Sequence, residues 1–278
     1  GFVCTLQAQY VIQSSCQFVY RIADVDTTMP LVIDPLYSTL IGGSGYESVN
    51  DFVVQGDSAV ILCLSTSSQD LVRADKSYQQ NSGGKKDVYI AVINLWTSKI
   101  LLSTYYGGSE DEFSVSLFTD EHGIKVIGIT GSSDLPTTNT AIQRNYGGEQ
   151  DCFVAAFDLN CETLVFSTYL GGAGLDIAEC GSFDTAGNAY LAGWTDSYSS
   201  FPRTVDAMQR IYGGGDDDAF VAKISNDGSK LLHSTFLGGA DFDEARGISV
   251  DPDGRIVVCG YTSSGNYPIR GNALQTSR

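Results

Sequence analysis

The chain has 278 residues, of which 42% are hydrophobic and 18% are charged, and this is enough to bury a sizeable core. Its formal net charge of −17 argues against nucleic acid and anionic membranes as partners, because both require a basic surface. No run of 18 apolar residues occurs, so no membrane-spanning helix is predicted.

The seven cysteines are too few for a disulfide framework, and their odd number leaves at least one thiol unpaired. No Cys-x-x-Cys pair occurs and the chain has only two histidines, which argues against a zinc site. If the protein is exported, two local disulfides can form, Cys4–Cys16 and Cys152–Cys161. The alternative is that all seven are small buried apolar residues.

The first 35 residues do not match the pattern that follows them. Phe18 to Ile22 alternates between apolar and polar residues, as a half-buried strand does. Leu31 to Pro35 then leads into the first copy of a repeat.

The repeat is marked by the sequence Ser-Thr-x-x-Gly-Gly, whose serines are spaced by 65, 64 and 67 residues. The four copies start at Ser38, Ser103, Ser167 and Ser234. Each unit begins with a predicted strand that ends at Gly-Gly and is followed by an acidic turn. Two further strands, joined by an Asp-Gly turn, come next. A longer loop then runs to a second Gly-Gly, and an Asp begins the last strand. We therefore place unit starts near residues 36, 101, 165 and 232.

Four short strands recurring every ~65 residues predict an all-β fold of β-propeller blades. Each blade would bury its faces only against its neighbours. Ser116, Cys180 and Gly247 occupy one position that is always small, and we place it on the innermost strand, where blades converge.

The fourth unit has only its first two strands. In one arrangement, Phe18–Ile22 and 36–41 complete this blade and close a four-bladed ring. In the other, which we favour, the chain is a piece of a larger propeller.

Five segments of the repeat units resemble the SBBP-type β-propeller repeat of large secreted or surface proteins. They are Phe166–Gly172, Asp184–Tyr190, Gly193–Thr195, Phe201-Pro202 and Asp218–Lys223. The resemblance covers residues 31–278 and implies an extracellular or cell-surface location without defined catalytic residues. It also implies that residues 1–30 are the tail of an upstream domain.

Carboxylates supply the weak candidates for a metal site. Asp216, Asp217 and Asp218 form the densest acidic cluster and could supply some calcium ligands. However, Asp87 and Asp151 hold the place of Asp218 in other units, which favours a turn cap at Asp218 and solvent-facing side chains at the two other acids. No cofactor is predicted.

Two tyrosines that precede Gly-Gly in the long excursion, Tyr146 and Tyr212, are the predicted partner contacts. The function that we expect is a non-enzymatic structural or adhesive module of an extracellular or cell-surface protein. Its partners would be proteins, including copies of itself. One alternative is a lectin-like propeller that binds carbohydrate or calcium, and another is a glycosidase that uses carboxylates in the channel.

Overall fold

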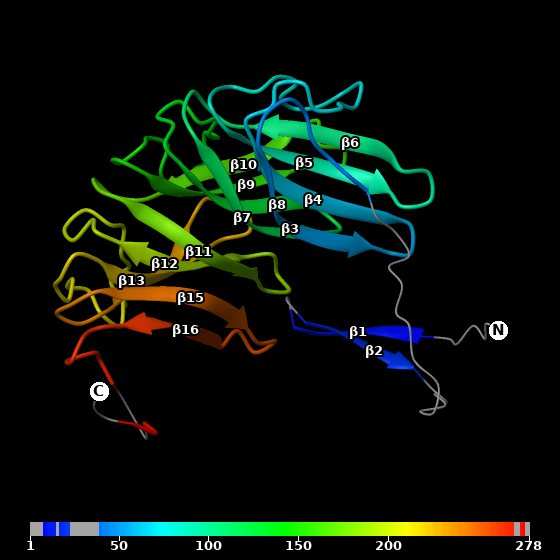
Figure 1. Ribbon diagram of the computed structural model, residues 1–278. Helices are drawn as coiled ribbons and strands as arrows, with labels where there is room; N and C mark the ends of the chain where they lie inside the picture. Colours follow the sequence, from blue (N-terminus) through cyan, green and yellow to red (C-terminus); the bar gives the residue numbers. More distant parts are fainter. Residues whose placement is uncertain (1–7, 15–16, 23–38, 270–272, 276–278) are drawn as a thin grey trace. The chain divides into compact units, whose positions relative to one another are not determined.

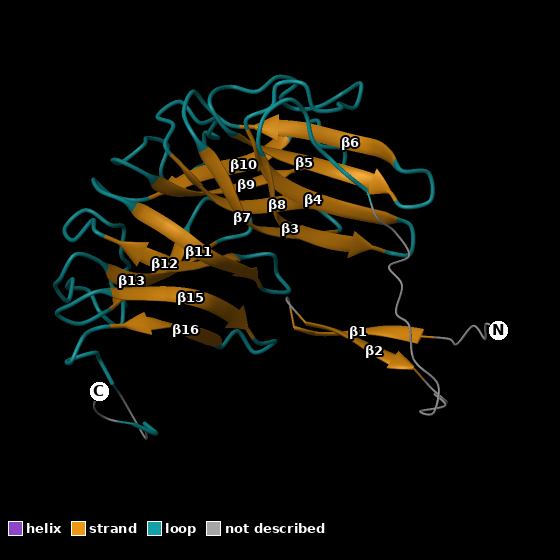
Figure 2. Cartoon of the chain, in the orientation of Figure 1, coloured by secondary structure: helices purple, strands orange, loops and turns teal. Residues whose placement is uncertain are grey.

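The computed structural model describes residues 8–14, 17–22, 39–269 and 273–275. All regular elements in these ranges are β-strands or isolated bridges (Figure 2), which confirms the predicted all-β class for this part of the chain. The same ranges contain no helix with the length and hydrophobicity needed to cross a membrane. The chain divides into two compact units, Gly1–Thr39 and Leu40–Arg278.

The described residues of the first unit, 8–14 and 17–22, pair as antiparallel strands. Strand β1 (Ala8–Ser14) pairs with β2 (Gln17–Ile22), with Ala8 opposite Ile22. The strand expected at Phe18–Ile22 is therefore confirmed as part of β2. Closure of a ring by this strand would join units that are described separately, so it stays a prediction.

The strand expected at residues 36–41 is wrong in its described part, since residues 39–41 are not in strand conformation. In the later copies, the Ser-Thr segment pairs with the strand that precedes it in the sequence. Here the preceding strand, β2, pairs with β1. Residues 36–38 lie outside the described residues.

The second unit consists of antiparallel sheets that follow one another along the chain (Figure 1). Sheet I contains β3 (Glu47–Gln55), β4 (Ala59–Thr66), β5 (Asp87–Asn94) and β6 (Lys99–Tyr106). Sheet II contains β7 (Glu112–Asp120), β8 (Gly123–Thr130), β9 (Asp151–Phe157) and β10 (Leu164–Leu170). Sheet III contains β11 (Asp176–Phe183), β12 (Ala189–Thr195), β13 (Asp218–Ile224) and β14 (Leu231–Leu237). Sheet IV contains β15 (Asp243–Val250) and β16 (Ile256–Thr262).

The sheets are offset by one strand from the repeat units defined in the sequence. The Ser-Thr strand that begins each unit is the last strand of a sheet, as in β6, β10 and β14. The Gly-Gly pair ends that strand, and the hydrogen-bond ladder of the next sheet starts at the acidic residue beyond it.

The first strand of each sheet carries a β-bulge at the same place. The bulges interrupt the pairing with the second strand between Val49 and Asp51, Ser114 and Ser116, Ala178 and Cys180, and Ala245 and Gly247. The predicted small position therefore ends each of the last three bulges. First strands of consecutive sheets contact one another, so this position lies where the sheets converge. In sheet I the residue at this position is not small but is Asp51. Its Oδ2 accepts a hydrogen bond from the backbone N–H of Leu117 at 2.8 Å.

The hydrophobic core lies between consecutive sheets. One cluster joins sheets I and II, for example through Ile90 and Phe153, and a second joins sheets II and III through Phe166 and Phe220. A smaller cluster joins sheets III and IV. Consecutive sheets thus bury apolar residues against each other, as the repeat predicts, whereas β3 of sheet I leaves Val49, Phe52 and Val54 exposed. No sheet closes the series into a ring within the described residues.

Candidate functional site at the sheet junctions

One acidic residue begins the first strand of every sheet, four residues after the second glycine of the Gly-Gly pair. The four are Glu47, Glu112, Asp176 and Asp243. Each accepts a hydrogen bond from the N–H of that glycine, at distances of 2.6 to 3.3 Å. The carboxylate therefore ties the start of one sheet to the Gly-Gly segment before it.

Hydroxyl groups supply further hydrogen bonds to this first acid in sheets II and III. In sheet III, Thr195 donates to Asp176 Oδ1 at 2.5 Å and Ser197 donates to Asp176 Oδ2 at 3.0 Å. Since the backbone N–H of Gly172 also donates to Oδ2, both oxygens of Asp176 are hydrogen-bonded.

A second acid opens the third strand of each complete sheet. Asp87, Asp151 and Asp218 each use Oδ2 to accept a backbone N–H, from Gly83 at 2.5 Å, Gly147 at 2.8 Å and Gly213 at 2.5 Å respectively. These bonds confirm the turn-capping role predicted for Asp218. The Oδ1 atoms of all three are buried and have no hydrogen-bond partner among the described residues.

The two acids flank one glycine of the intervening strand end and form what we call an acid pair. The acid pairs are Asp87/Glu112, Asp151/Asp176 and Asp218/Asp243. A Cβ placed on Gly171 would lie 2.8 Å from Asp176 Oδ2 and closer still to Asp151 Oδ1. Gly107 and Gly238 lie between the other two pairs in the same way. Glycine is required there because a side chain would collide with both carboxyl groups.

Burial dominates the electrostatics of the acid pairs, since all six side chains have zero exposure. It raises the pKa of Asp151 to about 7, with a further contribution from the charge of Asp176. Burial likewise raises the pKa of Glu112 and that of Asp218 to about 7, and the pKa of Asp176 to about 6. Two ionised carboxylates in such a site repel each other, so near neutral pH the pair Asp151/Asp176 favours holding one proton.

A raised pKa, which glycosidase acids have, occurs in five acids of the pairs, but these acids are not accessible; the five are Asp87, Glu112, Asp151, Asp176 and Asp218. Their oxygens contact glycine backbone and hydrogen-bond donors of the turns, and none of the six side chains is exposed. A substrate would have to reach a carboxyl group that solvent does not reach. What the contacts of the pairs do is tie the Gly-Gly segments to the strands that the acids open.

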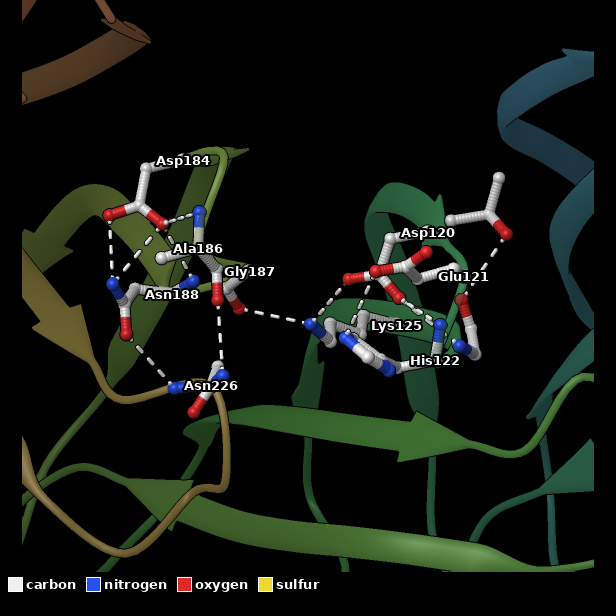
Figure 3. A network of polar contacts seen from close by, with 11 residues as sticks. Asp120, Glu121, His122, Lys125, Asp184, Ala186, Gly187, Asn188 and Asn226 are labelled. Carbon is white, nitrogen blue, oxygen red and sulfur yellow. Dashed lines mark hydrogen bonds and ion pairs between the residues drawn. The ribbon is translucent and has the colours of Figure 1, made fainter.

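A second polar network joins sheets II and III through their turns (Figure 3). The buried Lys125 donates to Asp120 Oδ2 at 3.0 Å and, across the sheet boundary, to the backbone carbonyl of Gly187 at 3.1 Å. Within sheet III, Asn226 donates its backbone N–H to Asn188 Oδ1 at 3.0 Å.

Asp residues organise these turns from within. Asp184 accepts the backbone N–H groups of Ala186 and Asn188, and Asp120 accepts those of His122 and Gly123. The network thus agrees with the β-turns predicted from the Asp-Gly segments.

The predicted acidic cluster separates into three environments. Asp216 is exposed as predicted, but Asp217 is only 6% exposed, so the expectation that it faces solvent is wrong. The backbone carbonyl of Asp217 accepts the N–H of Asp243, and this bond draws the residue into the junction. Asp218 belongs to an acid pair. In the part of the chain that is described, no group of three or more His, Cys, Asp or Glu residues is placed to hold a metal ion.

The two tyrosines proposed as partner contacts are half-buried in the loops of their sheets. The Tyr146 ring packs against Tyr169 at a centroid distance of 5.8 Å, and its hydroxyl donates to the backbone carbonyl of Glu149. Tyr212 packs against Phe236 at 5.5 Å. Both rings therefore contribute to packing within the protein.

The disulfide between Cys152 and Cys161 does not form, because both thiols are free and buried. Cys152 lies near the start of β9, where its Sγ contacts the backbone carbonyl of Asp176 at 3.2 Å, whereas Cys161 follows the other end of this strand. Seven residues of strand span about 20 Å, far beyond the reach of a disulfide. Cys4 and Cys16 lie outside the described residues.

The first acid of each pair was missed by sequence reasoning, although its constant offset of four residues from the second glycine could have revealed it. The second acid was recognised only as a turn residue. No protein-family model and no curated protein matches this chain.

Proposed function

We propose that the chain is a non-enzymatic structural module of an extracellular or cell-surface protein, in which the sheets are blades of a β-propeller of the SBBP-repeat type. The observation that carries the structural role is the acid pair, which recurs at three junctions with the same partners. A repeated group placed wholly inside the protein serves the architecture of each junction rather than one reaction.

The other titratable groups support the same role. Asp120, Asp184 and Asp251 accept the backbone N–H groups of their own turns, and Lys125 bridges two sheets. The extracellular or cell-surface location is inferred from the SBBP resemblance alone.

Native-state hydrogen exchange tests this proposal. A rigid module predicts that the second strands of the complete sheets, β4, β8 and β12, exchange with one common opening free energy, because each sheet is held by its neighbours. Opening free energies that differ by several kcal/mol between the sheets would show three independent units and refute a rigid scaffold.

A screen of glycoside substrates tests the non-enzymatic part. Hydrolysis that is lost in both Asp151→Asn and Asp176→Asn, but kept in Asp216→Asn, would instead support the glycosidase alternative.

A further inference from the structure

The acid pairs cross the boundaries between consecutive sheets. Asp151 lies on β9 of sheet II and Asp176 on β11 of sheet III. Asp87 on β5 and Glu112 on β7 span the boundary between sheets I and II in the same way. Both boundaries lie between complete four-stranded sheets. A bond between the two carboxyl groups of such a pair would therefore join two sheets directly.

In each of these two pairs, one buried oxygen receives no hydrogen bond from any described residue. Between sheets II and III this atom is Asp151 Oδ1. It lies 2.3 Å from the place where a Cβ on Gly171 would lie, and Asp176 Oδ2 lies 2.8 Å from the same point. The pair between sheets I and II has the same arrangement around Gly107, with distances of 2.3 and 2.5 Å. The oxygen without a partner thus faces an oxygen of the other acid.

A proton on Asp151 Oδ1 satisfies both of these oxygens. An ionised carboxylate only accepts hydrogen bonds, whereas a protonated carboxyl group also donates one. Asp176 already accepts hydrogen bonds on both oxygens, from Thr195, Ser197 and the N–H of Gly172, and these favour its ionised form. The free position for the proton is therefore Oδ1 of Asp151, and the acceptor is Oδ2 of Asp176.

The charges near this pair act in one direction. Burial, together with the charge of Asp176, raises the pKa of Asp151 to about 7. Burial and the charge of Asp196 raise the pKa of Asp176 to about 6. The ion pairs of the described residues involve neither member of the pair. The other titratable side chains nearby stay neutral at pH 7 because burial raises the pKa of each, and they are Cys152, Tyr146 and Tyr169.

We propose that these two acid pairs are proton-operated latches between consecutive sheets. The second acid carries the proton on Oδ1 and donates it to the facing oxygen of the first acid, which gives a charge-assisted O–H···O hydrogen bond. When the proton passes to solvent, the donor is lost and two negative charges remain in a buried site. The latch is therefore closed in acid and opens as the pH rises above neutral. This adds control by pH to the proposed structural role, and it can fail while that role stands.

NMR of the parent protein, carbon-13 labelled at the aspartate carboxyl groups, locates the proton. The signals are assigned by their loss in Asp151→Asn and Asp176→Asn. Asp151 is expected to titrate near pH 7, and Asp176 is expected to remain ionised to a lower pH. Titration of Asp151 near its ordinary value of 3.8 would overturn the proposal without any functional assay.

The variant Asp176→Asn tests whether the proton is shared between the two acids. It removes the negative charge that the O–H group of Asp151 faces, so Asp151 is expected to lose its proton at least about one pH unit lower. Asp216→Asn, at an exposed acid, is the matched control and should leave this titration unchanged. An unchanged titration in Asp176→Asn would mean that burial alone holds the proton, and the shared bond would be refuted.

Hydrogen exchange at the N–H of Gly172, which donates to Asp176 Oδ2 at 2.6 Å, measures opening of the latch. After correction for intrinsic exchange rates, its protection in the parent is expected to fall about a hundredfold from pH 5 to pH 8, as a pKa of about 7 requires. In Asp151→Asn the amide Nδ2 replaces the O–H donor at every pH, so the fall is expected to be at least about tenfold smaller.

An equal fall in the parent and in Asp151→Asn would overturn the latch. If Asp176→Asn does not fold, the parent titration and Asp151→Asn still decide the question. The rigid module is tested by comparing different sheets at one pH, whereas the latch is tested by comparing one amide across pH, so the two can fail separately.

Discussion

The acid pair Asp151/Asp176 makes a quantitative prediction about pH. The pKa of Asp151 is raised from its ordinary value of 3.8 to about 7, and one pKa unit corresponds to about 1.4 kcal/mol. Between pH 4 and pH 7, the folded state binds protons that the unfolded state does not. Stability is therefore highest at the acidic end of this range, falls as the pH rises to 7, and is level above it. For Asp151 alone the loss is about 4 kcal/mol.

The substitution Asp151→Asn mimics the protonated form at every pH. Its amide oxygen can still accept from Gly147 and Gln143, as Oδ2 does now, and its Nδ2 replaces the unpartnered Oδ1. The neutral amide oxygen accepts these hydrogen bonds less strongly than a carboxylate does, which lowers the unfolding free energy by about 2 kcal/mol. We therefore expect a net gain of about 2 kcal/mol at pH 8 and a smaller dependence of stability on pH.

Urea unfolding followed by circular dichroism at pH 5, 6, 7 and 8, at constant ionic strength, measures this effect. The matched control is Asp216→Asn, which neutralises an exposed acid of the same type and is expected to change little. The reasoning is refuted if Asp151→Asn is less stable than the parent at pH 8, or if both proteins lose stability equally between pH 5 and pH 8.

Three further predictions concern single contacts. Gly171→Ala is expected to lower the unfolding free energy by about 2 kcal/mol, because the added Cβ would collide with the acid pair. The control is Gly265→Ala, whose Cβ would have no atom within 4 Å. Equal melting temperatures for the two variants would contradict the packing argument. Lys125→Met keeps the buried stem but removes the bonds to Asp120 and Gly187, at a cost of about 2 kcal/mol in urea unfolding, whereas Lys99→Met at an exposed site should have no effect. Burial raises the pKa of Cys63 to about 12, so at pH 8 this thiol should react with a disulfide reagent only after unfolding, and fast reaction in the native protein would disprove its burial.

The repeat pattern predicted the β-sheets of the second unit because it combines two local signals. Apolar alternation marks the strands, and Asp-Gly segments mark the turns, as at Asp184–Gly187. Both depend on residues close in sequence. The small position at Ser116 was also predictable, since it repeats in every later unit.

The acid pairs were harder to predict because their two members come from different sheets. Asp151 and Asp176 are 25 residues apart and meet only when the Gly-Gly segment between them is placed. Burial of Asp217 has the same origin, since it follows from a backbone bond to the next sheet. The prediction of a Cys152–Cys161 disulfide was wrong because the two residues are close in sequence but are separated in space by the extended strand β9.

The one-strand offset between sequence units and sheets has a consequence for how such a protein can be divided. A fragment that begins at a Ser-Thr segment carries the last strand of one sheet and lacks the last strand of its own. A fragment cut after a Gly-Gly pair, such as residues 109–172, carries a whole sheet together with the Gly-Gly segment that the next acid binds. Shuffling or duplication of such modules therefore preserves the sheets only when the cuts fall after the glycines, and an array assembled at the other boundary would exchange strands between neighbouring chains.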